Sequence, residues 1–211
     1  MASGQLKPSS MPKDFSKEEL IQIVREAQEG SLDSFHRLYH FYSGAIYNFV
    51  WRLLGDSAEA EDLTQETFLK AHSEIKQLRD PAQFKYWLYR IARNEVYQRL
   101  RKTQRTTVVP IDDAEIPYYD FLEDKSSGLD PEAKVLALEL NSVIHKALDS
   151  MAPKYRDVFV LAVFQKESYE NISKVVGRSL LSVKTDIYRA RMTVKKKLNR
   201  YLNKKKWTAK K

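Results

Sequence analysis

Apolar residues recur at intervals of three and four along most of the chain, the spacing that places them on one face of a helix. The longest such run lies between Gly30 and Gly55. Its apolar positions are Phe35, Leu38, Tyr39, Tyr42, Ile46, Phe49, Val50 and Leu53. No stretch keeps the alternating pattern of a β-strand, so we predict an all-α protein.

Residues that cap helices divide this pattern into separate elements. Gly30 and Gly55 each follow the last apolar position of a run, where glycine commonly ends a helix. Asp56 precedes Glu59 by three residues, in the manner of a capping box. Asp80 is followed by proline, a pair that favours a helix start. These signals predict helices over 17–29, 31–53 and 57–76, and another from residue 80 to about 102.

A stretch without sustained helical period separates two helical parts of the chain. It is rich in acids, β-branched residues, Pro, Gly and Ser, and it is too long for an ordinary loop within one domain. We therefore predict two helical domains joined by a flexible acidic linker. The expected divisions are a mobile tail 1–16, a first domain 17–102, the linker 103–130, a second domain 131–202 and a basic tail 203–211.

Residues 168–191 have the pattern of a helix-turn-helix. Ser168 is the expected N-cap of its first helix, Gly177 ends that helix, and Ser179 caps the next. The second helix turns Val183, Ile187, Ala190 and Val194 inward and leaves Ser182, Lys184, Thr185, Tyr188, Arg189 and Arg191 outward. These outward side chains can contact phosphates and guanine edges of duplex DNA. An ordinary helical hairpin with a solvated basic face is the alternative.

Charge is unevenly distributed along the sequence. The 211 residues carry a net charge of +8, and 178–211 holds thirteen basic residues against Asp186 alone, whereas 106–132 holds eight acids against Lys125. The basic end favours a polyanionic partner. The first fifteen residues lack an apolar core and no run of 18 apolar residues follows, so we expect no membrane insertion and a cytoplasmic location.

Sequence motifs for catalysis are missing: there is no Gly-rich phosphate loop, GxSxG or HExxH. The chain has no cysteine, which excludes disulfides and thiolate metal sites. His36 and His40 have the i, i+4 spacing of a metal pair but no evident third ligand, so we interpret them as ordinary histidines. We expect no catalytic residue, no metal and no cofactor, and we rank an enzyme below any binding function.

An acidic face is expected on the third helix. Asp62, Gln65 and Glu66 fall on one exposed side, while Leu63 and Phe68 turn inward. Acids on a basic protein predict a protein partner with a positive surface.

The fourth helix interleaves aromatic and cationic side chains. Aromatic rings stack on unpaired bases and cations follow phosphates, so this helix is a candidate single-strand site. Trp87 also lies on the apolar stripe, which leaves its role open between core and base contact. The polar and aromatic positions are Tyr86, Tyr89, Arg90, Arg93, Asn94, Tyr97, Arg99, Arg101 and Lys102.

Three motifs together resemble the sigma factors of the extracytoplasmic function (ECF) group. AEDLTQETFL is similar to the family helix that docks on RNA polymerase, and FKYWLYRIARNEVYQRLRK to its promoter-melting segment. ALDSMAPKYRDVFVL and the helix-turn-helix resemble its domain 4. The resemblance covers 17–102 and 132–202, which it identifies as sigma domains 2 and 4.

The resemblance implies partners and residue roles. Asp62, Gln65 and Glu66, supported by Phe68 and Leu69, would bind the β′ clamp helices of core RNA polymerase, and the β flap is a second expected contact. The implied −10 DNA contacts are Tyr86, Trp87, Tyr89, Arg90, Arg93, Asn94, Arg99 and Arg101. The implied −35 contacts are Arg178, Ser182, Lys184, Thr185, Tyr188 and Arg189. Promoter DNA and an anti-sigma factor complete the expected partners, and the linker is similar to one that runs near the polymerase active centre.

Some positions depart from the family pattern, among them Gln98, Leu181 and Asp186. We expect Asp186 to weaken the attraction of its helix for phosphate. Two other functions remain open: a helix-turn-helix regulator that binds duplex DNA without joining polymerase, and an RNA- or single-strand-binding accessory protein. The first leaves the acidic face unexplained, and the second leaves the helix-turn-helix without a role.

Overall fold

The computed structural model describes residues 15–106 and 131–208, so the expected linker and most of both expected tails lie outside the described residues. Every regular element in those two ranges is helical, which confirms the all-α prediction. The elements are α1 (Lys17–Gln28), α2 (Leu32–Leu54), α3 (Ser57–Glu74), η1 (Ile75–Gln77), η2 (Pro81–Gln83), α4 (Phe84–Thr106), α5 (Pro131–Asp149), α6 (Pro153–Val163), α7 (Tyr169–Val176) and α8 (Leu180–Thr208).

Helices α1 to α4 form the N-terminal bundle, with α2 packed against α1, α3 and α4. The periodic apolar stripe of α2 supplies its centre, where Leu38, Ile46 and Phe49 are fully buried. Between α3 and α4 the chain passes through two short 3₁₀ turns instead of entering α4 directly at residue 80. Asp80 caps the second turn, because its carboxylate accepts a hydrogen bond from the Ala82 N–H at 3.0 Å.

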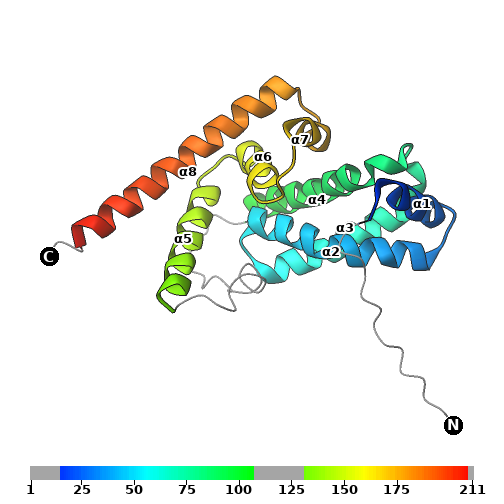
Figure 1. The fold of residues 1–211 in the computed structure, drawn as a ribbon, viewed down its shortest axis with the longest axis horizontal. Helices are drawn as coiled ribbons and strands as arrows, with labels where there is room; N and C mark the ends of the chain where they lie inside the picture. Colours follow the sequence, from blue (N-terminus) through cyan, green and yellow to red (C-terminus); the bar gives the residue numbers. More distant parts are fainter. Residues whose placement is uncertain (1–14, 107–130, 209–211) are drawn as a thin grey trace, which may run out of the picture.

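Helices α5 to α8 form the C-terminal bundle, which contains the predicted helix-turn-helix (Figure 1). Ser168 caps α7 through the Asn171 N–H, and Gly177 ends α7 in the left-handed conformation at φ 66°. The Ser179 hydroxyl then accepts from the Ser182 N–H at the start of α8. Local side-chain chemistry therefore sets this motif as predicted. Helix α8 continues past residue 202 to Thr208, beyond the expected end of the domain.

The two bundles pack against each other, an arrangement that the sequence did not predict. Helix α7 lies on α4, and α6 and α5 both lie on α2 (Figure 1). At the C-terminal end of α2, the Arg156 guanidinium donates to the Leu53 carbonyl at 2.7 Å. The domain boundaries proposed from the sequence stay a prediction, but the described helices fall into these two bundles.

His145 of α5 lies at this α2 end and is 5% exposed. Its ring packs edge-on against Trp51, with centroids 4.3 Å apart, and the Arg52 guanidinium lies 3.6 Å from the centre of the Phe164 ring. Burial, together with the positive charges of Arg52 and Arg156, lowers the pKa of His145 to about 4. This histidine is therefore packed in its neutral form between two cations.

Acid should weaken this packing. The pKa of His145 is lowered from 6.5 to about 4 in the folded protein. The folded state is therefore fully stable above pH 6.5 with respect to this group and loses stability as the pH falls towards 4. We expect this residue alone to lower the free energy of unfolding by on the order of 1–2 kcal/mol at pH 5. Urea unfolding of the wild type and of His145→Gln at several pH values measures the difference. Equal pH dependence in the two proteins would contradict the assignment.

Candidate nucleic-acid interface

The acidic face of α3 is exposed as predicted. Asp62, Gln65 and Glu66 all reach solvent, whereas Phe68 is 3% exposed and packs against the Tyr39 ring. Leu69 is 73% exposed, so it does not support the helix by packing but adds an apolar contact point to the same surface. Two chemistries therefore meet on α3, an acidic one and an apolar one.

One residue expected to bind DNA lies against this acidic face instead. The Arg99 guanidinium pairs with the Glu66 carboxylate at 3.3 Å and with that of Glu59 at 3.8 Å. These side chains are partly exposed, so the pairs contribute little to stability. The geometry nevertheless links the candidate DNA face of α4 to the candidate protein-docking face of α3.

A cavity of about 380 Å³ opens at the start of α4, and we call it the α4 pocket. Tyr86, Trp87 and Arg90 of α4 line part of it, and the turns before α4 and one residue of α7 supply the rest. Trp87 is 9% exposed and packs on Phe84, so it belongs to the core and to the pocket wall at once. The remaining lining residues are Gln77, Leu78, Arg79, Asp80, Gln83 and Lys174.

The other candidate −10 residues are placed unevenly. Arg90, Asn94 and Arg101 are exposed. Tyr89 is 1% exposed, with its ring against Phe49 and its hydroxyl donating to the Gln165 side chain at 2.8 Å. Tyr89 is therefore a buried residue in this arrangement, because its ring packs on Phe49 of α2. Its DNA contact stays a prediction.

Arg93 also points away from solvent, towards the C-terminal bundle. Its Nε donates to Asp157 of α6 at 2.6 Å, and the Tyr97 hydroxyl donates to the same carboxylate oxygen at 2.9 Å. The second oxygen of Asp157 lies 3.4 Å from the Arg178 guanidinium. We call these four residues the Asp157 cluster. Asp157 is fully buried, and burial raises the pKa of its carboxyl while Arg93 and Arg178 oppose that effect.

The face of the helix-turn-helix is exposed at most of its predicted positions. Lys184, Thr185, Tyr188 and Arg189 reach solvent, and Ser182 is partly exposed. The Arg189 guanidinium donates to the Tyr155 hydroxyl at 3.0 Å. Leu181, which departs from the family pattern, is 75% exposed and adds an apolar side chain to this face.

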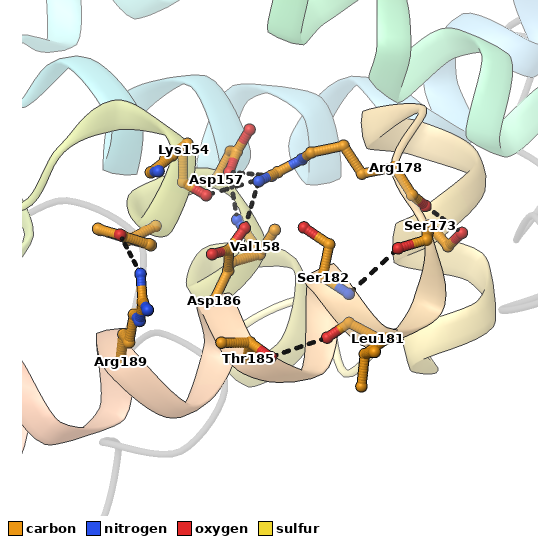
Figure 2. Close-up of polar contacts among 12 residues, drawn as sticks. Lys154, Asp157, Val158, Ser173, Arg178, Leu181, Ser182, Thr185, Asp186 and Arg189 are labelled. Carbon is orange, nitrogen blue, oxygen red and sulfur yellow. Dashed lines mark hydrogen bonds and ion pairs between the residues drawn. The ribbon is translucent and has the colours of Figure 1, made fainter.

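Arg178 is oriented differently from the other candidate −35 residues. It turns inward and forms ion pairs with Asp157 and Asp186 (Figure 2). Asp186 is 6% exposed, and its carboxylate lies against the Arg178 guanidinium. The Asp186 carboxylate holds the Arg178 side chain at the turn of the helix-turn-helix.

The sequence analysis did not identify four residues that join the two bundles. Asp157, Gln165, Glu167 and His145 make their contacts to the N-terminal bundle, with partners far away in the chain. Of these four, only Asp157 has a sequence pattern that indicates burial, because it directly precedes the apolar run VFVL.

Comparison with known proteins assigns both bundles. Residues 38–106 match Sigma-70 region 2, and residues 142–198 match Sigma-70, region 4. The ECF RNA polymerase sigma factor SigW of Bacillus subtilis is 32% identical over 179 residues, which cover 83% of this chain and 94% of that protein. The RNA polymerase sigma-H factor of Pseudomonas aeruginosa is 31% identical, over 84% of this chain and 92% of its own.

Solved structures share the fold. CnrH, in complex with the cytosolic domain of CnrY, aligns with a TM-score of 0.62 at 22% identity, over 85% of this chain and 97% of that chain. The sigma factor RpoE of Bartonella quintana, in complex with the anti-sigma factor NepR, aligns with a TM-score of 0.60 at 22% identity, over 80% of this chain and 98% of that chain.

Taken with the two exposed faces, these matches define a two-domain factor of transcription initiation. The chain belongs to the ECF group of the sigma-70 family of RNA polymerase sigma factors. Within the described ranges, no helix is long and apolar enough to cross a membrane. The Nε2 atoms of His36 and His40 lie 3.0 Å apart, but residues 15–106 and 131–208 contain no group of three or more potential metal ligands.

The role of Asp186 can be tested by substitution. Asp186→Ala removes the nearest carboxylate from the partly buried Arg178, so we expect the free energy of unfolding to fall by about 1–3 kcal/mol. Urea denaturation measures this loss, and Lys184→Ala, on the exposed face of the same helix, is the control. Unchanged stability with stronger DNA binding would instead show that Asp186 acts as an outward charge.

Proposed function

We propose that this chain binds core RNA polymerase and directs it to promoters, with the N-terminal bundle opening and reading the −10 element and the C-terminal bundle reading the −35 element. The observation that carries the proposal is that one chain has both a helix-turn-helix and a pocket lined by aromatic and cationic side chains. A helix-turn-helix suits duplex DNA, whereas a pocket walled by aromatic rings and cations suits an unpaired base. A factor that only binds duplex DNA needs no such pocket.

The α3 face supports the polymerase contact. Asp62, Gln65 and Glu66 are exposed, and Leu69 beside them offers an apolar anchor. Acids steer a positively charged partner, while the apolar side chain adds buried area on docking. In this proposal the partner is the β′ clamp helices, and the β flap is the second polymerase contact, made by the C-terminal bundle.

The α4 pocket supports capture of a base from the opened −10 strand. Tyr86 and Trp87 provide ring faces, and the exposed Arg90 lies where it can reach the adjoining phosphate. Removing a base from the stack costs a few kcal/mol, and stacking on an aromatic ring offsets a cost of that size. Asn94 and Arg101 extend the same exposed side of α4.

The exposed start of α8 supports recognition of duplex DNA. Ser182, Lys184, Thr185, Tyr188 and Arg189 lie in the first turns of the second helix of a helix-turn-helix, the part that enters the major groove. Arg178 is a positioning residue of the turn in this proposal, because its guanidinium is engaged by two carboxylates.

The remaining parts of the proposal follow from the family. The chain contributes binding and strand opening, polymerase carries out the chemistry, and both act in the cytoplasm. An anti-sigma factor is a further proposed partner, since relatives of the same fold are described in such complexes.

Reversing the charge of the α3 face tests the polymerase contact. We expect Asp62→Lys/Glu66→Lys to abolish specific initiation in transcription in vitro with purified core polymerase, because like charges would face each other across the interface. The Arg99 pair lost with Glu66 is exposed and matters little for stability.

Glu18→Lys/Glu29→Lys makes the same change of charge at exposed positions of the N-terminal bundle and should retain activity. If the Asp62/Glu66 variant initiates normally, the docking site is wrong. If neither the variant nor the wild type ever engages polymerase, a duplex-binding regulator replaces the proposal.

Removing a ring from the α4 pocket tests base capture. Stacking is worth about 1–3 kcal/mol per base, so Tyr86→Ala should lower the yield of open promoter complexes by about tenfold or more. Permanganate reactivity of unpaired thymines measures opening, and duplex binding to the −35 element should not change. Normal opening by Tyr86→Ala would exclude this pocket.

A further inference from the structure

A large apolar side chain is exposed at the start of α8, among the residues that the proposed function assigns to duplex DNA. Leu181 is the second residue of α8 and is 75% exposed, the largest fraction among the exposed large apolar side chains of the described residues. In a helix-turn-helix, the N-terminal residues of the second helix face the base edges in the major groove. Under the proposed function, Leu181 therefore occupies a position from which a side chain can read a base.

Leu181 shares its face of α8 with Thr185 and Tyr188. The three residues follow the spacing i, i+4, i+7, and all are exposed. The Thr185 hydroxyl donates to the Leu181 carbonyl at 3.0 Å (Figure 2), and a hydroxyl has only one proton to donate. While that bond is made, Thr185 offers a base a methyl group and an acceptor but no donor. The outer face of the first turns of α8 is therefore rich in apolar groups.

The guanidinium groups near this face are engaged by other side chains of the C-terminal bundle. Arg178 forms ion pairs with Asp157 and Asp186, and Arg189 donates to the Tyr155 hydroxyl at 3.0 Å. A bidentate guanidinium contact to guanine is the commonest way in which a side chain specifies a base. Because Arg178 is turned inward, the start of α8 depends more on apolar contacts for its choice of sequence.

The chemistry of an apolar side chain limits which base it can favour. In the major groove, the 5-methyl group of thymine is the apolar group among the hydrogen-bonding atoms of the base edges. Leucine has no polar group, so against a guanine, adenine or cytosine edge it would cover donors or acceptors without replacing their bonds to water. Against a thymine methyl group it removes apolar surface of both partners from water, which is favourable.

We propose that Leu181 selects a thymine in the −35 element by packing on its 5-methyl group, with the Thr185 methyl group beside it. The inference rests on the proposed function, because it requires α8 to enter the major groove. Lys184 and Arg189 lie next to the apolar face and are exposed. In this proposal they contact phosphates, which holds the helix on the duplex without choosing a base.

The first step of the test finds the thymine. The full chain, alone and bound to core polymerase, is used to enrich duplexes from a random library, and Leu181→Ser is treated in the same way. We expect one thymine position of the wild-type site to lose its preference in the variant. Met192→Ser is the matched control, because Met192 is an exposed apolar residue of α8 that lies about 16 Å further along the helix, and it should keep the wild-type preference.

The second step isolates the methyl group in the selected duplex. Deoxyuridine in place of that thymine removes only the methyl group, and 5-methylcytosine in place of cytosine adds one at the same position of a different base pair. We expect the wild type to bind the deoxyuridine duplex about fourfold more weakly, and the 5-methylcytosine duplex about fourfold more tightly than the cytosine duplex, as for one buried methyl group. Leu181→Ser should not distinguish the members of either pair.

Fluorescence anisotropy at one salt concentration measures these affinities, because phosphate contacts make binding depend on salt. Each ratio compares two duplexes with one protein, so a general loss of affinity in the variant cancels. Equal binding of the thymine and deoxyuridine duplexes by the wild type would overturn the role of Leu181 and leave α8 as a duplex reader. A deoxyuridine effect that persists in Leu181→Ser would also overturn it, since another side chain would then contact the methyl group. If the wild type enriches no sequence, alone or with polymerase, the proposed function of α8 fails together with this inference.

Discussion

One buried carboxylate joins the two bundles at the centre of their polar contacts. Asp157 is shared between Arg93 of the N-terminal bundle and Arg178 of the helix-turn-helix, with the Tyr97 hydroxyl as a third partner. A buried carboxylate without such partners would cost several kcal/mol. Arg178 belongs to the same bundle as Asp157, whereas Arg93 comes from the other bundle. Asp157 therefore connects the turn of the helix-turn-helix to α4.

The elements whose causes are local could be predicted from the sequence. Ser168, Gly177 and Ser179 act within a few residues of themselves, and they set the helix-turn-helix as expected. The exposed face of α3 likewise followed from helical spacing. The packing of the bundles could not be predicted in this way, because the Arg93–Asp157 contact joins residues 64 positions apart and depends on the relative position of two folded parts.

Three residues show where helical spacing alone does not identify the partner of a side chain. Tyr89 and Arg93 lie among cationic and aromatic neighbours on α4, so the sequence predicts that they contact single-stranded DNA. In the structure both form hydrogen bonds with the C-terminal bundle. The sequence predicts that Asp186 weakens the attraction of its helix for phosphate, and in the structure its carboxylate pairs with Arg178. In each case the residue type was informative, and the partner was decided by tertiary structure. Which of these side chains touch DNA remains a proposal.

Helix α8 is one uninterrupted helix from Leu180 to Thr208, and its far end is held to α5 where the Tyr201 hydroxyl donates to Glu139. At 1.5 Å per residue, about 25 Å of stiff helix separates that anchor from Lys184. Helices α6 and α7 also pack against α8. In the proposed function, the direction of the recognition side chains therefore depends on contacts along the whole helix, including some made far from the helix-turn-helix.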